Sequence, residues 1–217
     1  MDSKTGIHIE YRVATKQDLP QISEVFASAF PESLSHYVGP DKLSPLVMAD
    51  AFAACLEAQP NAFFVATVGN EVVGYVFAPT DLSRVFRVFL LHGHFLGMLR
   101  RWVRGHYGIG FRTALLATWN SIYMATQSRK SMQQGDARIL SIAVRPNGQG
   151  LGIGSALMKI ALDHLRSSEA NIVRLEVRAD NEPARHIYEN YGFKVVGKTR
   201  DTQAEWVIMA KDLQESS

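Results

Sequence analysis

Four glycines cluster between Val144 and Ser155, in the sequence VRPNGQGLGIGS. Glycine has no side chain, so the backbone N–H groups of such a segment can approach a ligand closely. Apolar residues precede the glycines with a strand-like pattern, and a helical pattern follows Gly152, which places the cluster at a strand-to-helix junction. The unpaired N–H groups and the positive dipole end of a helix N-terminus bind anions. The segment therefore predicts an anion site suited to a pyrophosphate.

The spacing of these glycines excludes two common phosphate-binding loops. A dinucleotide fingerprint needs a glycine as its sixth residue, counted from Gly150, but Ser155 stands there, and Val177 is followed by Arg178 rather than by an acidic residue. The phosphate loop of nucleotide triphosphatases ends in Gly-Lys-Ser/Thr, which this chain lacks. A glycine-rich turn without a ligand is the remaining structural alternative.

Two motifs in order resemble those of the GNAT (GCN5-related) N-acetyltransferases. The sequence QGLGIG from Gln149 to Gly154 is similar to the Q/R-x-x-G-x-G/A motif of that family. The sequence from Asn181 to Phe193 resembles the second signature, an Asn and then an aromatic residue, here Tyr188, four residues before Gly-Phe. The start of the chain, Tyr11–Thr15 followed by Asp18, also resembles GNAT N-termini. The resemblance covers nearly the whole chain except its basic middle segment.

The resemblance implies a fold and a domain organisation. The expected class is α/β, with a single mixed, mostly antiparallel central sheet flanked by helices. A helical insertion is expected between the third and fourth strands, over residues 82–136, within one domain that spans residues 1–217. Strands are expected over 7–13, 63–68, 72–77, 138–144, 172–177, 193–198 and 204–209, and helices over 15–30, 44–58, 111–126, 152–165 and 182–190.

The family also implies roles for individual residues. The backbone of Ile142 and Val144 would pair with the pantetheine arm of acetyl-CoA like an added strand, and Asn181 would contact the same arm. The backbone donors expected at the pyrophosphate are those of Gln149, Gly150, Gly152, Gly154 and Ser155. The N–H of Ile142 would polarise the thioester carbonyl, and Tyr188 would protonate the leaving thiolate. Without the resemblance to the family, Tyr188 would be interpreted as a core aromatic residue and Asn181 as a helix cap.

The general base that deprotonates the acceptor amine is harder to identify. Some members of the family place a glutamate on the central strand, but here the corresponding residue is expected to be Ser141, a poor base. Glu32 and His36, or a water relay, are the candidates that remain. A metal site is not expected, since Cys55 is the only cysteine and His92 and His94 are too few and too close together.

Charge is distributed unevenly along the chain. The segment 82–135 contains eight basic residues and no Asp or Glu, which leaves 15 basic and 21 acidic residues elsewhere, a net charge of −6. This asymmetry suggests an anionic partner for the basic segment. One hypothesis is that Arg100, Arg101 and Arg104 bind an anionic acceptor such as a nucleotide-linked amino sugar.

Two other interpretations of the basic segment stay open. An amphipathic helix with Phe86, Phe89, Phe95 and Trp102 could contact an anionic membrane peripherally. Alternatively, a helical hairpin packs on the core or on a second subunit of a homodimer. Nucleic acid is not expected as a partner, because these aromatic residues recur at the spacing of a helix core rather than a stacking platform.

The sequence as a whole predicts an acetyl-CoA-dependent N-acetyltransferase that acts on a primary amine of a small molecule. Two alternatives remain: a non-catalytic acyl-CoA-binding regulatory module, and an acetyltransferase for a protein or peptide amine. The polar N-terminus has no apolar signal core, and no apolar run reaches the length of about 20 residues that spans a bilayer. A cytoplasmic location is therefore expected.

Overall fold

The computed structural model describes residues 8–31, 46–108, 110, 137–201 and 204–214. The expected elements within these ranges form, mostly within two residues of the expected bounds. They are β1 (Ile9–Val13), α1 (Leu19–Ala29), α3 (Leu46–Ala58), β2 (Phe63–Val68), β3 (Glu71–Phe77), α4 (Leu82–Leu91), α5 (His94–Val103), β4 (Ala137–Arg138), β5 (Ser141–Val144), α7 (Ile153–Ser167), β6 (Ile172–Arg178), α8 (Glu182–Asn190), β7 (Lys194–Arg200) and β8 (Glu205–Asp212). The helix expected over 111–126 lies outside the described residues.

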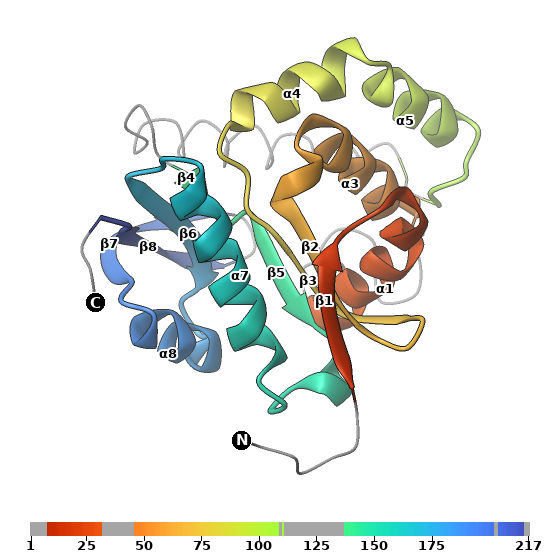
Figure 1. The fold of residues 1–217 in the computed structure, drawn as a ribbon. Coiled ribbons are helices and arrows are strands. Elements are labelled where there is room, and N and C mark those ends of the chain that lie inside the picture. Colours follow the sequence, from red (N-terminus) through yellow and green to blue (C-terminus); the bar gives the residue numbers. More distant parts are fainter. Residues whose placement is uncertain (1–7, 32–45, 109, 111–136, 202–203, 215–217) are drawn as a thin grey trace.

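The strands form two four-stranded sheets, in the orders β1-β2-β3-β5 and β4-β6-β8-β7 (Figure 1). Every neighbouring pair is antiparallel except β4 and β6, which are parallel. The expected mixed, mostly antiparallel α/β architecture is therefore confirmed. The central sheet expected as one piece is divided in two between β5 and β6.

The division occurs within one extended segment, residues 137–144. Its first half pairs with β6, where the Ile139 N–H donates to the Arg174 carbonyl. On its other side the segment already follows the end of β3, since the Arg138 N–H donates to the Pro79 carbonyl and the Leu140 N–H to the Phe77 carbonyl, although the register places Ser141 opposite Phe77. Two residues thus lie opposite one residue of β3, which is the geometry of a β-bulge. Beyond it β5 stays with β3 and separates from β6.

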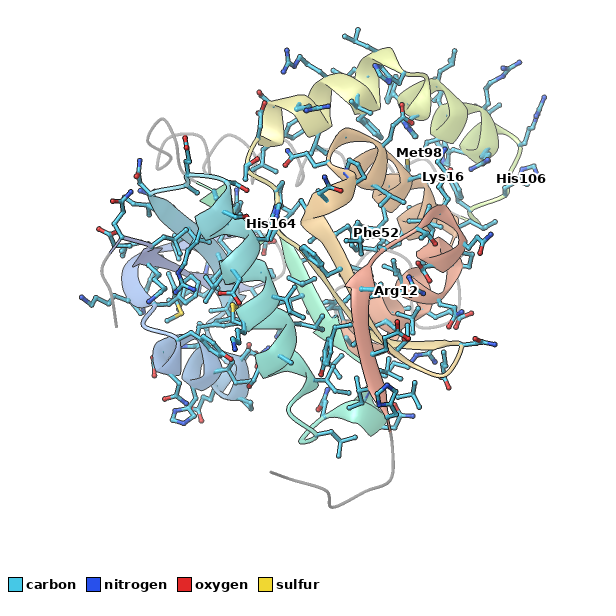
Figure 2. The ribbon with its side chains drawn as sticks, in the orientation of Figure 1. Arg12, Lys16, Phe52, Met98, His106 and His164 are labelled. Carbon is cyan, nitrogen blue, oxygen red and sulfur yellow. The ribbon has the colours of Figure 1, made fainter. Side chains whose placement is uncertain are left out.

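Helices cover both faces of the first sheet. Helix α7 packs on β2, β3 and β5 from one side, and α1 and α3 cover the other. On that second side Phe52 of α3 lies in the interior, with edge-on contacts to the rings of Phe63 and Tyr75 (Figure 2). Leu157, Met158 and other apolar residues of α7 form the main core with both sheets. The helices therefore hold the two sheets together on either side of their division.

An ion pair fixes the start of α1. Asp18 is buried and accepts hydrogen bonds from both terminal nitrogens of Arg12, at 2.7 and 2.8 Å. The Thr15 N–H and hydroxyl donate to the same carboxylate at 2.7 and 2.8 Å. These bonds hold the pKa of Asp18 at about 2, with the Arg12 guanidinium as the main cause. The capping pattern expected at Thr15 and Asp18 is thus present.

Helices α4 and α5 follow β3 and form an outer layer over α3 (Figure 1). Asp81 caps α4 by accepting a hydrogen bond from the Arg84 N–H at 3.1 Å, and Gly93, with a φ of 85°, allows the sharp change of direction between the two helices. Among the described helices, none has the length and apolarity needed to cross a bilayer.

Candidate functional site

The glycine cluster forms the loop between β5 and α7. A 3₁₀ turn over Pro146–Gly148 follows β5, and Gly150 and Gly152 then have φ values of 79° and 76°. This left-handed region disfavours residues with a Cβ atom, which explains the glycine requirement at both positions. Gly152 is the residue that directly precedes the first turn of α7.

The loop leaves its backbone donors unpaired. In the part of the chain that the structure describes, no hydrogen bond uses the N–H groups of residues 150–155, whereas the next one, Ala156, donates to the Gly152 carbonyl at 3.0 Å. The first residue of α7, Ile153, lies close to the sheet, because a Cβ at Gly74 of β3 would come within 3.2 Å of its side chain. A row of free donors at a helix N-terminus is the arrangement that binds phosphate.

Strand β5 presents a second set of backbone donors. The Arg145 N–H donates to the Val73 carbonyl at 2.8 Å, and donors alternate in direction along an antiparallel strand. Ala143 therefore points its N–H toward β3, while Ile142 and Val144 point theirs to the opposite side, into the gap left by β6. These are the two residues predicted to pair with the pantetheine arm.

A cavity of about 580 Å³ joins the loop, β5 and α8; we call it the loop cavity. Its lining includes every residue predicted to contact the cofactor, namely Ile142, Val144, Gln149, Gly150, Gly152, Gly154, Ser155, Asn181 and Tyr188. Asn181 also caps α8, since its side chain accepts a hydrogen bond from the Ala184 N–H at 3.2 Å. Capping and lining the cavity are thus compatible roles for this residue.

A second cavity, of about 600 Å³, is bordered by the same end of α1 and by α8, and is here called the strand cavity. Residues 139–142 and 175–178 of the two separating strands line it as well, together with Trp206 of β8. Seven residues line both cavities: Ala29, Phe30, Ile142, Asn181, Pro183, Ala184 and Tyr188. The two cavities therefore meet around Ile142 and Tyr188.

Tyr188 lies at this junction and is 9% exposed. Its ring packs against Phe193, with ring centroids 6.1 Å apart, and burial raises the pKa of its phenol to about 12. The group is therefore protonated at neutral pH and can donate a hydrogen bond at the point where the cavities meet. A raised pKa also makes it a weaker acid than an ordinary phenol, with a pKa of about 10.

The strand cavity contains a carboxylate, Glu176, that the motifs do not single out. It is half-buried on β6 and forms an ion pair with Arg138 of β4. Val173, Leu175 and Val177 alternate with it and point into the core, so Glu176 lies on the opposite face of the strand. The alternation of residues along β6 predicts that Glu176 lies on this face. Its place in the cavity depends on the separation of β5 from β6, which the sequence does not show.

Other polar groups of the strand cavity are hydrogen-bonded to one another, whereas the buried indole nitrogen of Trp206 has no hydrogen-bond partner among the described residues. Arg178 holds Asp180 through two hydrogen bonds of 3.0 and 2.7 Å. The Ser141 and Tyr75 hydroxyls are hydrogen-bonded at 2.8 Å, and burial raises the pKa of Tyr75 well above its ordinary value. Ser141 does face the cavity, as expected, but as the partner of a phenol.

The three arginines predicted to bind the acceptor do not reach either cavity. Arg100, Arg101 and Arg104 belong to the outer layer of α5, and Arg101 forms an ion pair with Asp50 of α3. Glu32 and His36, the base candidates from the N-terminal half, lie outside the described residues.

The two histidines between α4 and α5 share one carboxylate. His92 Nδ1 lies 2.7 Å and His94 Nε2 2.8 Å from the oxygens of Glu57 on α3. In the described ranges, no cluster of three or more such side chains has a geometry that could hold a metal. These histidines therefore attach the outer helices to α3.

Comparison with known proteins agrees with this geometry. A family model described as the acetyltransferase (GNAT) family matches residues 19–193. An N-alpha-acetyltransferase of Sulfolobus acidocaldarius is 28% identical over 196 residues, which are 90% of this chain and 85% of the relative. A mycothiol acetyltransferase of Brachybacterium faecium is 43% identical over 68 residues, 31% of this chain and 20% of the relative.

A solved structure from Salmonella typhimurium, described with its cofactor acetyl-CoA, has the same fold. The two superpose with a TM-score of 0.57 at 14% sequence identity, over 96% of each chain. The family match extends from the first residue of α1 to the Phe193 that packs on Tyr188. The chain therefore belongs to the GNAT family of N-acetyltransferases, enzymes that take their acetyl group from acetyl-CoA.

Proposed function

We propose that this enzyme transfers the acetyl group to the N-terminal α-amine of a polypeptide. The observation that carries the proposal is the meeting of the two cavities at Tyr188, with a half-buried carboxylate in the second cavity. The loop cavity takes acetyl-CoA, and the strand cavity takes the amine. Direct transfer needs both substrates bound at once in contact with each other, and adjoining cavities allow this.

The loop cavity fits the donor through backbone groups. The N–H groups of residues 150–155 hold the pyrophosphate at the start of α7, and β5 offers Ile142 and Val144 to the pantetheine amides. The Ile142 N–H also donates to the thioester oxygen as negative charge develops there. The site thus relies on fixed backbone donors that need no rearrangement.

Tyr188 acts on the sulfur side of the reaction. A phenol with a pKa of about 12 stays neutral and donates a hydrogen bond to the sulfur as the C–S bond breaks. Full proton transfer to a thiolate, whose conjugate acid has a pKa of about 8.5, is uphill from such a phenol. Its main contribution is therefore stabilisation of the departing thiolate, with the proton supplied by the attacking amine.

Glu176 is the proposed acceptor of a different proton, the one that the ammonium form of the acceptor loses before it attacks; the proton that reaches the thiolate leaves the nitrogen after the attack. Glu176 is held in place by Arg138 and lies in the strand cavity, where the amine must approach. An α-amine has a pKa of about 8, so an appreciable part is already neutral at physiological pH, whereas a lysine side chain has a pKa of about 10.4. The α-amine therefore needs less assistance from a base than a lysine side chain does.

The character of the strand cavity supports a cationic rather than an anionic acceptor. Its charged lining consists of the carboxylates Glu176 and Asp180 and the guanidinium Arg178, which is already bound to Asp180. The relative that matches nearly the whole chain is named an N-alpha-acetyltransferase, whereas the mycothiol enzyme matches only 31% of it. The hypothesis of a nucleotide-linked amino sugar gains no support from the described residues.

An acceptor screen tests the proposal. Purified enzyme is incubated with acetyl-CoA and three acceptor panels: peptides with free α-amines, the same peptides with blocked N-termini but a lysine, and amino sugars with and without nucleotide groups. Release of free thiol is followed, and the product is located by mass spectrometry. We expect acetylation of the free α-amines. Preferential acetylation of the sugars, or acetyl-CoA binding without turnover on any panel, would exclude the proposed acceptor.

A further inference from the structure

The outer layer of α4 and α5 exposes an unusual amount of apolar surface. Seven large apolar side chains, which we call the outer face, are exposed on these two helices: Phe86, Leu90, Leu91, Phe95, Leu96, Leu99 and Val103. Leu91 and Val103 are 77% and 73% exposed, and Leu90 and Leu96 are 60% and 56% exposed. A contiguous apolar surface of this kind on a globular protein marks an interaction site.

The outer face is distinct from the side by which these helices attach to the rest of the protein. Val88 is buried toward α3, and His92, His94 and Arg101 bind acidic residues of α3. Figure 2 likewise shows Met98 on the side of α5 nearer α3. Both faces of this layer are thus apolar, and only the inner one is covered by the described residues.

The exposed residues follow the helical repeat. On α5, Phe95, Leu99 and Val103 recur every four residues and form one stripe, with Leu96 beside it. Phe86 and Leu90 are four residues apart on α4. The most exposed leucine, Leu91, lies just before Gly93, where the chain turns from one helix to the other. The apolar surface is therefore continuous across the elbow between the helices.

Arginines border this apolar surface. Arg100 and Arg104 are exposed, four residues apart on α5, and flank the stripe. On α4, Arg84 and Arg87 are exposed as well, and Arg87 retains only a long contact of 3.7 Å with Asp81. The segment 82–135 contains no acidic residue at all. The surface thus combines exposed aliphatic and aromatic side chains with charge of one sign.

We propose that the outer face of α4 and α5 binds the surface of a membrane that contains anionic phospholipid. Amphipathic helices of this composition lie in the bilayer interface, with leucine and phenylalanine side chains among the acyl chains and arginines at the lipid phosphates. Leu91 and Leu96 at the elbow enter the interface, while Arg84, Arg87, Arg100 and Arg104 contact the headgroups.

The positive charge of the outer face argues against a second copy of this chain as its binding partner. A two-fold symmetric dimer through the outer face would bring the same surface of each subunit together. The arginines of one copy would then face those of the other, with no acidic residue from the segment 82–135 to pair with them. An anionic bilayer offers both an apolar interior and the opposite charge.

Vesicle co-sedimentation tests the proposal with the full chain. Vesicles of phosphatidylcholine alone are compared with vesicles of phosphatidylcholine and phosphatidylglycerol in equal parts. We expect sedimentation with the anionic vesicles, lost in high salt. Leu91→Asp with Leu96→Asp should abolish it, and Arg100→Gln with Arg104→Gln should weaken it by about 25-fold, or about five-fold for each arginine.

Matched changes at the other end of the molecule serve as controls. Val196→Asp replaces a residue of β7 that is 57% exposed, and Lys194→Gln with Arg200→Gln removes two charges from the same strand. These controls should bind vesicles like the wild type, and all variants should keep the wild-type affinity for acetyl-CoA, which monitors folding. The absence of sedimentation, or equal sedimentation of every variant, would overturn the proposal. So would a dimer that Leu91→Asp with Leu96→Asp converts to a monomer, without vesicle binding.

Discussion

The Tyr191 hydroxyl donates a hydrogen bond of 2.7 Å to the Ser155 carbonyl oxygen. The bond joins the end of α8 to the first turn of α7, 36 positions apart in sequence. Ser155 belongs to the turn whose free N–H groups line the loop cavity. Tyr191 thus ties the helix that carries Tyr188 to the glycine loop at the start of α7.

Removing this hydroxyl should loosen the loop without altering the chemical groups. We expect Tyr191→Phe to lower the free energy of unfolding by about 1 kcal/mol, the usual net contribution of one hydrogen bond. The affinity for acetyl-CoA should fall by a few-fold, since the donors of the loop are less well ordered. Isothermal titration calorimetry and urea unfolding measure the two effects. An unchanged affinity would show that the loop is ordered without α8.

Tyr188→Phe should reduce turnover while leaving acetyl-CoA binding intact. The phenylalanine ring keeps the contact with Phe193, but the hydrogen bond to the departing sulfur is lost. We expect kcat to fall by about 100-fold, within the range usual for a positioned proton donor. Burial raises the pKa of Tyr188 to about 12, so its phenol stays protonated in the wild type up to about pH 10. Ionisation of Tyr188 should therefore not lower kcat below that pH. A variant with wild-type kcat would remove Tyr188 from the mechanism.

Glu176→Gln should produce a pH-dependent loss of activity. At neutral pH we expect kcat/KM for a peptide acceptor to fall by about 100-fold, since the amine loses the group that takes its proton. Above pH 8 the α-amine, with a pKa of about 8, is mostly neutral without assistance, so the loss should shrink. Asp180→Asn in the same cavity is the control and should show no such pH dependence. An equal loss at every pH would mean that Glu176 only positions Arg138.

Two glycines of the loop should respond to alanine in opposite ways. Gly152 has a φ of 76° with nothing near the added Cβ, so Gly152→Ala should cost about 1 kcal/mol through backbone strain alone. Gly154 lies inside α7 with ordinary φ, and its Cβ would meet Val144 at a comfortable 3.8 Å. Gly154→Ala should therefore leave stability unchanged or raise it. Thermal unfolding of both variants checks the contrast, and equal destabilisation would contradict it.

The Asp18 carboxylate should make the fold sensitive to acid. Its folded-state pKa of about 2 lies below the unfolded value of about 3.9, so its contribution is complete above pH 4 and is lost as pH falls toward 2. The contribution amounts to roughly 2 kcal/mol. Asp18→Asn should be less stable than the wild type by this amount at pH 7, and the difference should narrow near pH 2.5. Urea unfolding at both pH values measures it, and a constant difference would exclude this linkage.

The parts of the structure that depend on local pattern could be predicted from the sequence. The strands Phe63–Val68 and Glu71–Phe77 are bounded by a glycine turn and read directly as a hairpin. The glycine loop and α8 could also be predicted from the sequence, because turn and capping preferences are local. The glycine loop and α8 supply most of the residues that line the loop cavity.

The parts that depend on long-range pairing could not be predicted in this way. Residues 138–144 read as one strand, and nothing local shows that the segment separates from β6 near Leu140 while it stays with β3. Glu176 reads as an ordinary residue on one face of a strand until that division places it beside the cavity. Arg101 looked available for a ligand, but its partner Asp50 is 51 positions away.

The bulge at Leu140 determines which residues of β5 direct their N–H groups into the gap between the two sheets. Ile139 directs its N–H to β6, and a strand without an extra residue would continue to alternate from there. If the N–H groups alternated without interruption from Ile139, then Ala143, and not Ile142 or Val144, would direct its N–H into the gap between the sheets. The single additional residue reverses the alternation, so Ile142, which lines the loop cavity together with Tyr188, directs its N–H into the gap. One inserted position, carrying no reactive group itself, thus selects which peptide units of β5 face the gap between the sheets.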